Sequence, residues 1–309
     1  MNQYFPKISK GFKYLATRVI TFCLCILAVY CLFNDQKEIQ TKTKIEVLNR
    51  LRPLVFMPFM EVVEGTQPLE KKRFDKYFNY FKDVVDVMPH LADANCVLGI
   101  SYALLNKPQK AEEHLKRAAE LKPDVYIFFH NLGIFYFQQK SYKSARWVMD
   151  KALLKHPAEN IKYIYSSRVF LPFIIEANMI SQKDIEQRIR DEYHSSEVLM
   201  ILSDYYLGYY QEMYLRSVAG IKANSIQDGD MFLLAAVASL HLGQLEHAKG
   251  LFEEYYKKVQ GDQAAQEFIQ SIMPYFQPGV LPAHKEELQE LGSIHFQKVF
   301  NKHLQFLLY

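Results

Sequence analysis

Hydrophobic and small residues recur along residues 92–159 with a period of 34 residues. The first copy contains Leu98-Gly99, Tyr102, Ala111, Ala118 and Pro123, and the second contains Leu132-Gly133, Tyr136, Ala145, Ala152 and Pro157. A fixed period of this length predicts a two-helix unit that stacks on copies of itself. Residues 92–159 are therefore expected to form two such units.

The glycines and alanines of these units predict close contact between helices. Gly99 and Gly133 fall in the middle of predicted helices, where glycine is about 1 kcal/mol less favourable than alanine. We expect a partner helix to lie so close to each glycine that a larger side chain would not fit. Ala111 and Ala118 lie two turns apart on one face of the second helix and permit the same approach. The proline that closes each copy is expected to end its second helix.

This pattern resembles the tetratricopeptide repeat, in which an aromatic residue, Leu-Gly, Tyr, Ala, a second aromatic residue, Ala and Pro follow in order. The first copy has Asn95 and Leu115 at the two aromatic positions, and the second has Phe129 and Met149 there. The resemblance implies an all-α fold, a helix-turn-helix repeat α-solenoid. It also implies a protein-binding function, because such proteins hold a partner in a concave groove lined by the first helix of each unit.

The resemblance further implies which positions line that groove. They are Asp93, Cys96, Ile100, Ala103 and Leu104 in the first unit, and Ile127, His130, Ile134, Phe137 and Gln138 in the second. We expect the partner-binding residues to be Cys96, Ile100, Leu104, Ile127, His130, Ile134, Phe137 and Gln138. Relatives that grip a C-terminal carboxylate carry Lys and Asn at such positions. This chain has neither at the matching places, so that activity is not implied.

The predicted groove is mostly apolar, which leaves two possible occupants. An exposed apolar strip of this kind usually marks a binding site. The occupant is either a peptide or amphipathic helix of a partner protein, or the apolar segment 45–64 of the chain itself.

The N-terminus is predicted to anchor the chain in a membrane. Residues 1–13 form a basic tail without acidic residues, and residues 14–33 are twenty residues in which Arg18 is the only charge. Twenty residues at a helical rise of about 1.5 Å span about 30 Å, the thickness of a bilayer core. A cleaved signal peptide or a lipoprotein signal requires small residues beside its cleavage site, and this segment fits that requirement poorly. We therefore expect an uncleaved, single transmembrane helix.

The orientation of the anchor is less clearly encoded. Lysine and arginine occur in nearly equal numbers on its two sides, so the positive-inside rule favours neither direction. Because long domains cross a membrane largely regardless of their charge, we expect a cytoplasmic N-terminus and a repeat domain on the far side. Residues 34–44 form a polar tether that follows the anchor.

The segments around the two clear units predict degenerate repeats and caps. Residues 45–91 are expected to form an N-terminal cap and, through Tyr77, Phe81 and Val84, the second helix of an eroded repeat. Residues 160–228 predict degenerate helical repeats, including an aromatic-rich helix pair over 195–222. Residues 229–261 predict a third repeat unit, with Gly243 at its turn. Residues 262–309 predict capping helices, which would cover the end of the array.

Composition and motifs narrow the function classes. The 309-residue chain has a net charge of +3 without a basic block outside the N-terminus, so a nucleic-acid partner is not expected. No phosphate-binding loop, metal-ligand spacing or nucleophile motif occurs in the sequence. Cys23, Cys25 and Cys31 lie in the apolar N-terminal run, which leaves Cys96 for the folded region. We expect no enzyme activity, no cofactor and no metal.

Three functional hypotheses follow, from different classes. The leading one is a membrane-anchored scaffold that binds a partner protein in the groove. A second is a membrane-bound protein that associates with copies of itself into an oligomer or coat. A third is an enzyme with a site in residues 160–230, where tyrosines are concentrated: Tyr193, Tyr205, Tyr206, Tyr209, Tyr210 and Tyr214.

Overall fold

The computed structural model describes residues 36–46, 71–155, 159, 182–223, 229–276, 286, 287, 290, 299 and 300. The chain divides into two compact units, residues 1–54 and residues 55–309. In the first unit, residues 36–46 are helical, and Lys42 pairs with Glu38 across one turn at 2.7 Å. Much of the predicted polar tether therefore forms a solvated helix.

The predicted basic tail and transmembrane segment 14–33 lie outside the described residues. Of the helices that the structure does describe, none is both long and apolar enough to cross a bilayer. The membrane anchor therefore stays a prediction.

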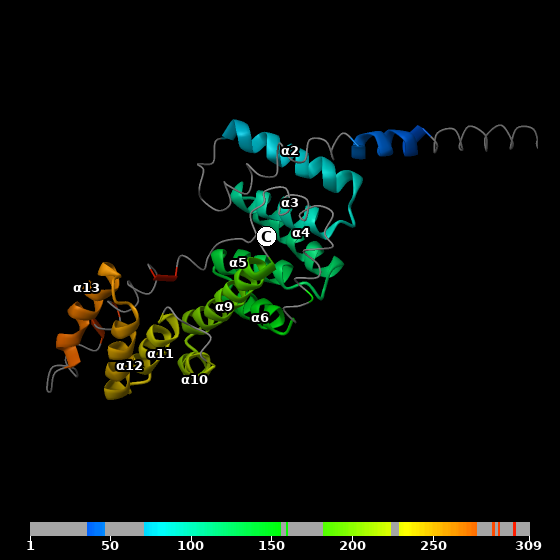
Figure 1. The fold of residues 1–309 in the computed structure, drawn as a ribbon. Helices are drawn as coiled ribbons and strands as arrows, with labels where there is room; N and C mark the ends of the chain where they lie inside the picture. Colours follow the sequence, from blue (N-terminus) through cyan, green and yellow to red (C-terminus); the bar gives the residue numbers. More distant parts are fainter. Residues whose placement is uncertain are drawn as a thin grey trace, which may run out of the picture. The chain divides into compact units, whose positions relative to one another are not determined.

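Every regular element described in the second unit is helical (Figure 1). The elements are α2 (Lys71–Val87), α3 (Ala92–Leu104), α4 (Pro108–Leu121), α5 (Tyr126–Gln138), α6 (Tyr142–Leu153), α9 (Gln182–Tyr206), α10 (Tyr210–Lys222), α11 (Asp230–His241), α12 (Leu245–Lys258), α13 (Gln263–Ile272) and the 3-10 helix η1 (Met273–Phe276). The two clear sequence repeats are the pairs α3–α4 and α5–α6, so the prediction of helix-turn-helix units is confirmed.

The interpretation of the mid-helix glycines is also confirmed. A Cβ atom on Gly99 would lie 2.7 Å from Leu115 Cγ, and one on Gly133 would lie 2.5 Å from Met149 Cε. Both distances are too short for non-bonded carbon atoms. The small residue in the first helix of each unit therefore admits a large side chain from the second.

Four turns of the array share one backbone conformation. The second residue after the end of each first helix has a positive φ: Asn106 (54°), Lys140 (58°), Gly208 (75°) and Gly243 (77°). The next amide N–H donates to the carbonyl five residues earlier at 2.9 Å in all four turns: Lys107 to Tyr102, Ser141 to Tyr136, Tyr209 to Asp204 and Gln244 to Ser239. This is the left-handed C-cap that satisfies the last carbonyls of a helix.

These turns establish the register of the units in which the sequence pattern fades. Asp204 corresponds to Tyr136 at an interval of 68 residues, which is two periods, and Ser239 follows after 35 more. The pair α9–α10 is therefore a unit of the same kind as the two clear repeats, although it lacks their Leu-Gly and Pro. The pair α11–α12 is the unit predicted at 229–261.

With the register established, the missing glycine of α9 has a physical explanation. In each unit, one position on the first helix faces one position on the second, as Gly99 faces Leu115. In chain order the four pairs are Gly99 and Leu115, Gly133 and Met149, Ile201 and Ser217, and Ala236 and Phe252. All eight residues are buried. Where the first helix carries the large residue, the second carries a small one. The space between the helices is thus filled in each unit, and the α9–α10 unit fills it with the two sizes exchanged.

Helices pack in chain order along the array. Helix α2 packs on α3 through Tyr77, Phe81 and Val84, as predicted for the second helix of an eroded repeat. Helix α9 packs on α6 and starts at Gln182 rather than near the predicted residue 195. Helix α13 and η1 pack on α12. Phe300, in the predicted C-terminal capping segment, is also buried.

Candidate functional site

The residues predicted to line an open groove are mostly buried. Cys96, Ile100, Ile127, His130, Ile134 and Phe137 are buried, Leu104 is half-buried and Gln138 is exposed. Ile100 and Ile134, at the centre of the predicted strip, are 0% exposed. The expectation of an open apolar strip is therefore not met, and whether these residues bind a partner stays a prediction.

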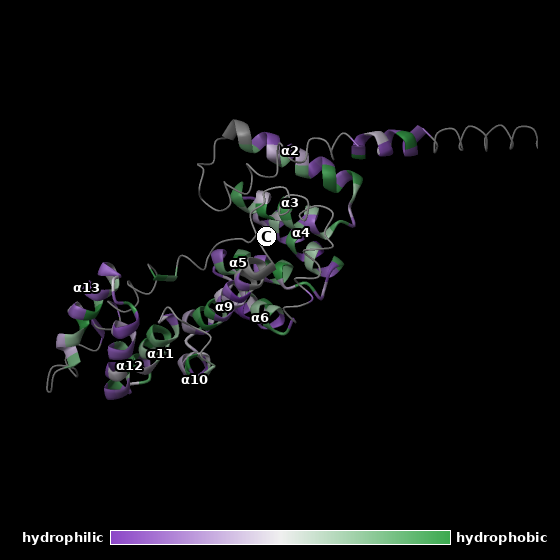
Figure 2. Cartoon of the chain, viewed as in Figure 1, coloured by the Kyte–Doolittle hydropathy of each residue, from purple (hydrophilic) through white to green (hydrophobic). Residues whose placement is uncertain are grey.

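The reason is that α3 and α5, the first helices of the two clear units, are enclosed on nearly all sides. Every residue from 92 to 102 in α3 is buried, and eleven consecutive residues cover the full circumference of a helix. Helices α5 and α11 are buried almost as completely. Most residues of α5 and α11 are themselves hydrophobic (Figure 2), as expected for helices without a solvent-facing side.

Buried polar groups join α5 to α9. Ser196 Oγ lies 2.6 Å from His130 Nδ1 and 2.7 Å from Tyr126 Oη, and these last two atoms are 3.0 Å apart. The three side chains are completely buried, and the Tyr126 ring stacks on Tyr193 of α9 with centroids 4.2 Å apart. A histidine beside a serine can activate a nucleophile, but this pair is sealed from solvent. Its role in this arrangement is to connect two units.

The thiol of Cys96 in α3 likewise contacts a side chain of a neighbouring helix, α5. Asn131 Nδ2 donates to its Sγ at 3.3 Å, and burial raises the pKa of the thiol to about 12. The thiolate is the reactive form of cysteine, so Cys96 is an inert interior residue rather than a reactive one.

A buried carboxylate connects three helices, and sequence reasoning missed it. Asp204 of α9 occupies the position that Tyr102 and Tyr136 hold in the earlier units, and its side chain is fully buried. Arg146 of α6 donates a hydrogen bond to Asp204 Oδ1, and Arg216 Nε of α10 lies 3.3 Å from Oδ2. Burial raises the pKa of the Asp204 carboxyl above its ordinary value, although the guanidinium groups of Arg146 and Arg216 lower that pKa in part.

Several of the described tyrosines in the region 160–230 are packing residues. Tyr206 stacks on Tyr142 of α6 at 4.4 Å between centroids, and Tyr210 stacks on His241 of α11 at 4.2 Å. Within the described ranges, no group of His, Cys, Asp or Glu side chains is arranged to hold a metal ion. The tyrosines therefore join neighbouring units, which gives the enzyme hypothesis no support from them.

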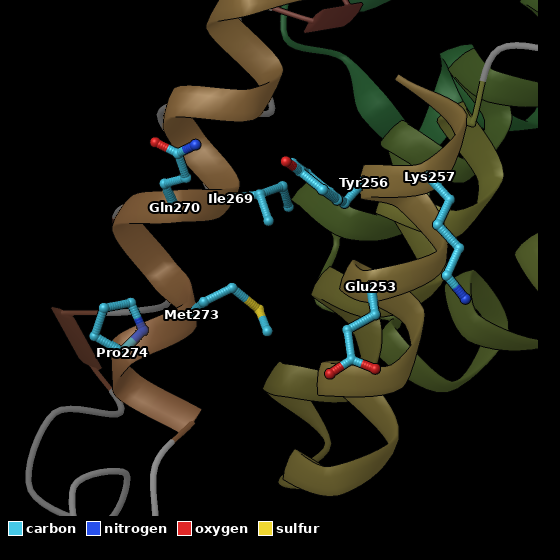
Figure 3. Close-up of a pocket in the computed structure, with 7 residues that line it drawn as sticks. All are labelled: Glu253, Tyr256, Lys257, Ile269, Gln270, Met273 and Pro274. Atoms are coloured by element: carbon cyan, nitrogen blue, oxygen red, sulfur yellow. The ribbon is translucent and has the colours of Figure 1, made fainter. Parts of the chain in front are cut away.

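A pocket of about 570 Å³ lies beside α12, α13 and η1 (Figure 3). Its lining residues are Glu253, Tyr256, Lys257, Ile269, Gln270, Met273 and Pro274. Ile269, Met273 and the ring of Tyr256 give it an apolar wall, and Lys257 is paired with Glu254 at 2.6 Å. The pocket suits an apolar side chain, and no feature of the sequence had indicated it.

No family model and no curated protein matches the chain. Two solved structures are similar to it at low scores. The structure of Naa15/Naa10 bound to HypK-THB has 16% identity and a TM-score of 0.38, over 86% of this chain and 35% of that one. The pilF structure from Pseudomonas aeruginosa has 17% identity and a TM-score of 0.29, over 71% of this chain and 99% of that one. This chain thus spans about a third of the first protein.

At these scores neither similarity carries an argument about partners or activity. The fold is established by the chain's own geometry, in which four helix pairs share one turn and one pattern of interior packing. It is a tetratricopeptide-like helical repeat.

Proposed function

We propose that this protein is a membrane-anchored scaffold that binds another protein through its helical repeats. The observation that carries the proposal is that the buried polar groups of the array have structural roles. The buried His130, Ser196 and Asp204, and the stacked tyrosines, all join one helix unit to the next. Since these groups are occupied in building the array, its outer surfaces and its covered inner face remain for function.

The membrane part of the proposal is supported by the sequence. Residues 14–33 are long and apolar enough for one span, and the helix at 36–46 is polar and solvated. We expect the protein to stay in the membrane fraction after carbonate extraction and to retain its original N-terminus. A mature N-terminus after Cys31 or Phe33 would contradict the anchor.

The partner-binding part concerns the face lined by α3 and α5. Because Ile100 and Ile134 are completely buried, a partner must displace whatever covers them before it can bind. Neighbouring helices supply part of this cover, since α3 contacts α2, α4 and α5 and α5 contacts α6 and α9. The segment 45–64 is the further candidate that the sequence offers, and its residues 47–64 lie outside the described residues.

Photo-cross-linking tests where the partner binds. A photoreactive amino acid at Gln138, which is exposed at the end of α5, samples the edge of this face. The same amino acid at Glu120, exposed on α4, samples the opposite side of a unit. We expect a heavier cross-linked species from Gln138 alone. Equal products from both positions would contradict the proposal, and a product with twice the chain's mass would support self-association instead.

A further inference from the structure

One outer helix of the array differs from its equivalents in charge. Residues 140–155, which contain α6, carry five basic side chains and one acidic, a net charge of +4. The equivalent stretches are 106–121, with four basic and three acidic residues, 208–223, with two and one, and 243–258, with three and three. Their net charges are +1, +1 and 0, and the whole chain carries only +3. Positive charge is therefore concentrated on residues 140–155, of which α6 itself carries three basic side chains and one acidic.

The same helix exposes large apolar side chains. Trp147, the single tryptophan of the chain, is 60% exposed, and Leu154 just beyond the end of α6 is 78% exposed. Leu215 of α10, which is 56% exposed, occupies the position of Trp147 in the next unit. Exposed hydrophobic residues of this size are few among the described residues, and two of them, Trp147 and Leu154, lie on α6 and directly after its end.

Basic and aromatic groups are side by side on this surface. Lys151 Nζ lies 3.7 Å from the centre of the Trp147 ring, a cation–π contact that holds a charge against an exposed indole. Trp147, Lys151 and Leu154 are four and then three residues apart and so share one face of the helix. Arg146 is engaged by the buried Asp204, so lysines supply the free charge of this face. We call Trp147, Lys143, Lys151 and Leu154 the α6 surface.

We propose that the α6 surface rests on the headgroups of an anionic lipid membrane. Tryptophan is enriched where a protein meets the membrane–water interface, because its ring is apolar and its N–H is polar. Lysine stems cover apolar surface while their ammonium groups reach the phosphates, and nearby lysines are attracted by anionic lipids.

One observation favours a membrane over an acidic protein as the contact. A strongly exposed indole and leucine lie beside lysines on one helix face, and this mixture of apolar and basic groups matches an anionic interface, in which charged headgroups lie directly above acyl chains. The anchored scaffold proposed above, on which this inference draws, would also keep the surface near a bilayer. The test does not require the anchor.

The single tryptophan makes the test direct. Full-length protein is mixed with, or reconstituted into, vesicles of phosphatidylcholine alone or of phosphatidylcholine and phosphatidylglycerol. We expect Trp147 emission to shift to shorter wavelength only with phosphatidylglycerol. Lipids with brominated acyl chains should then quench it, and acrylamide should quench it less. High salt should reverse these changes, because the attraction is between exposed charges.

Charge-reversal variants provide the matched comparison. The pair Lys143→Glu and Lys151→Glu should weaken the response to phosphatidylglycerol at least about tenfold, since each lysine near an anionic surface contributes strongly to binding. The pair Lys249→Glu and Lys258→Glu, on α12, makes the same change in net charge and should have little effect. Circular dichroism of both variants checks that they are folded.

Two outcomes would overturn the inference. One is a Trp147 that remains open to acrylamide and unquenched by brominated lipids in phosphatidylglycerol vesicles. The other is an equal loss of response in both variants, which would reflect net charge alone. If Trp147 instead responds only to an acidic protein, the α6 surface is a protein interface. Carbonate extraction measures the anchor separately, so failure of the anchor and failure of the α6 surface are distinguishable.

Discussion

Pairs of facing residues in the units exchange their sizes. Gly99 leaves room for Leu115, whereas in the α9–α10 unit Ile201 occupies the glycine position and Ser217 occupies the leucine position. Since protein interiors are close-packed, either member of a pair can be small, but both cannot be large.

This exchange predicts coupled substitutions. Ser217→Leu should destabilise the protein by about 1–3 kcal/mol, because it places a second large side chain where Ile201 already fills the space. Adding Ile201→Gly rebuilds the pairing of the first unit, so the double variant should be less destabilised than the sum of the single ones. Chemical denaturation measures all three. Strict additivity would show that the two side chains do not share this space.

A half-buried histidine links α4 to the start of α3. Asn95 Nδ2 donates to the carbonyls of Pro89 and Leu91, so its Oδ1 is left to accept from His114 Nδ1 at 3.2 Å. The His114 ring also stacks on Tyr102. Asn95 occupies an aromatic position of the repeat pattern, and these hydrogen bonds explain why the chain departs from the pattern there.

His114 predicts a pH dependence of stability. Burial lowers the pKa of His114 below its ordinary value of 6.5. Between the folded and the unfolded pKa the unfolded chain binds more protons, so stability falls as pH drops through about 6.5. His114→Gln removes the titration, and its loss of stability between pH 7.5 and pH 5.5 should be smaller than that of the natural protein. Parallel losses in the two proteins would contradict the assignment.

At the scale of helices, contacts between units rely on buried polar groups as well as on apolar ones. Asp204 of α9 pairs with arginines of α6 and α10, and Ser196 of α9 meets His130 of α5. Helix α9 is therefore the element that joins the α5–α6 unit to the α9–α10 unit.

Removal of the Asp204 carboxylate should be costly. Asp204→Ala should destabilise the protein by about 1–3 kcal/mol, because it removes the buried partner of Arg146 and Arg216, whose side chains are each about one third exposed and can be partly solvated. Glu120→Ala removes an exposed pair with Arg117 and should cost less than about 1 kcal/mol. Denaturant midpoints compare the two variants. A similar small effect of both would mean that Asp204 does not hold the units together.

At the scale of the whole array, the enclosure of the first helices bears on partner binding. The double variant Ile100→Asp and Ile134→Asp places two carboxylates at completely buried positions. We expect a loss of at least about 3 kcal/mol, because buried charges without partners are strongly destabilising.

Gln138→Asp, at the exposed end of the same face, serves as the control and should melt almost unchanged. Proteolysis of the double variant should also cut segment 45–64 faster if that segment covers the face. An unchanged melting temperature with lost partner binding would show instead that the groove is open in solution.

The helices and their pairing could be predicted largely from the sequence. Periodicity, glycine and proline are local signals, because they reflect hydrogen bonds and contacts between residues that are close in the chain. The mid-helix Gly99 and Gly133 even indicated where two helices nearly touch. The α9–α10 unit could not be recognised in the same way, since the exchange of sizes at Ile201 and Ser217 removes the glycine on which the pattern depends.

The candidate sites depended on tertiary structure. Exposure of an apolar position is decided by what packs against it, and the sequence predicted an open face at Ile100 and Ile134 that the fold encloses. The contacts of Ser196 with His130 and of Asp204 with Arg146 join residues 66 and 58 positions apart. The sequence alone determined helix type, repeat period and close helix contact, because short-range interactions set them. Long-range packing decided which faces are covered, which polar groups meet and which side chains reach solvent.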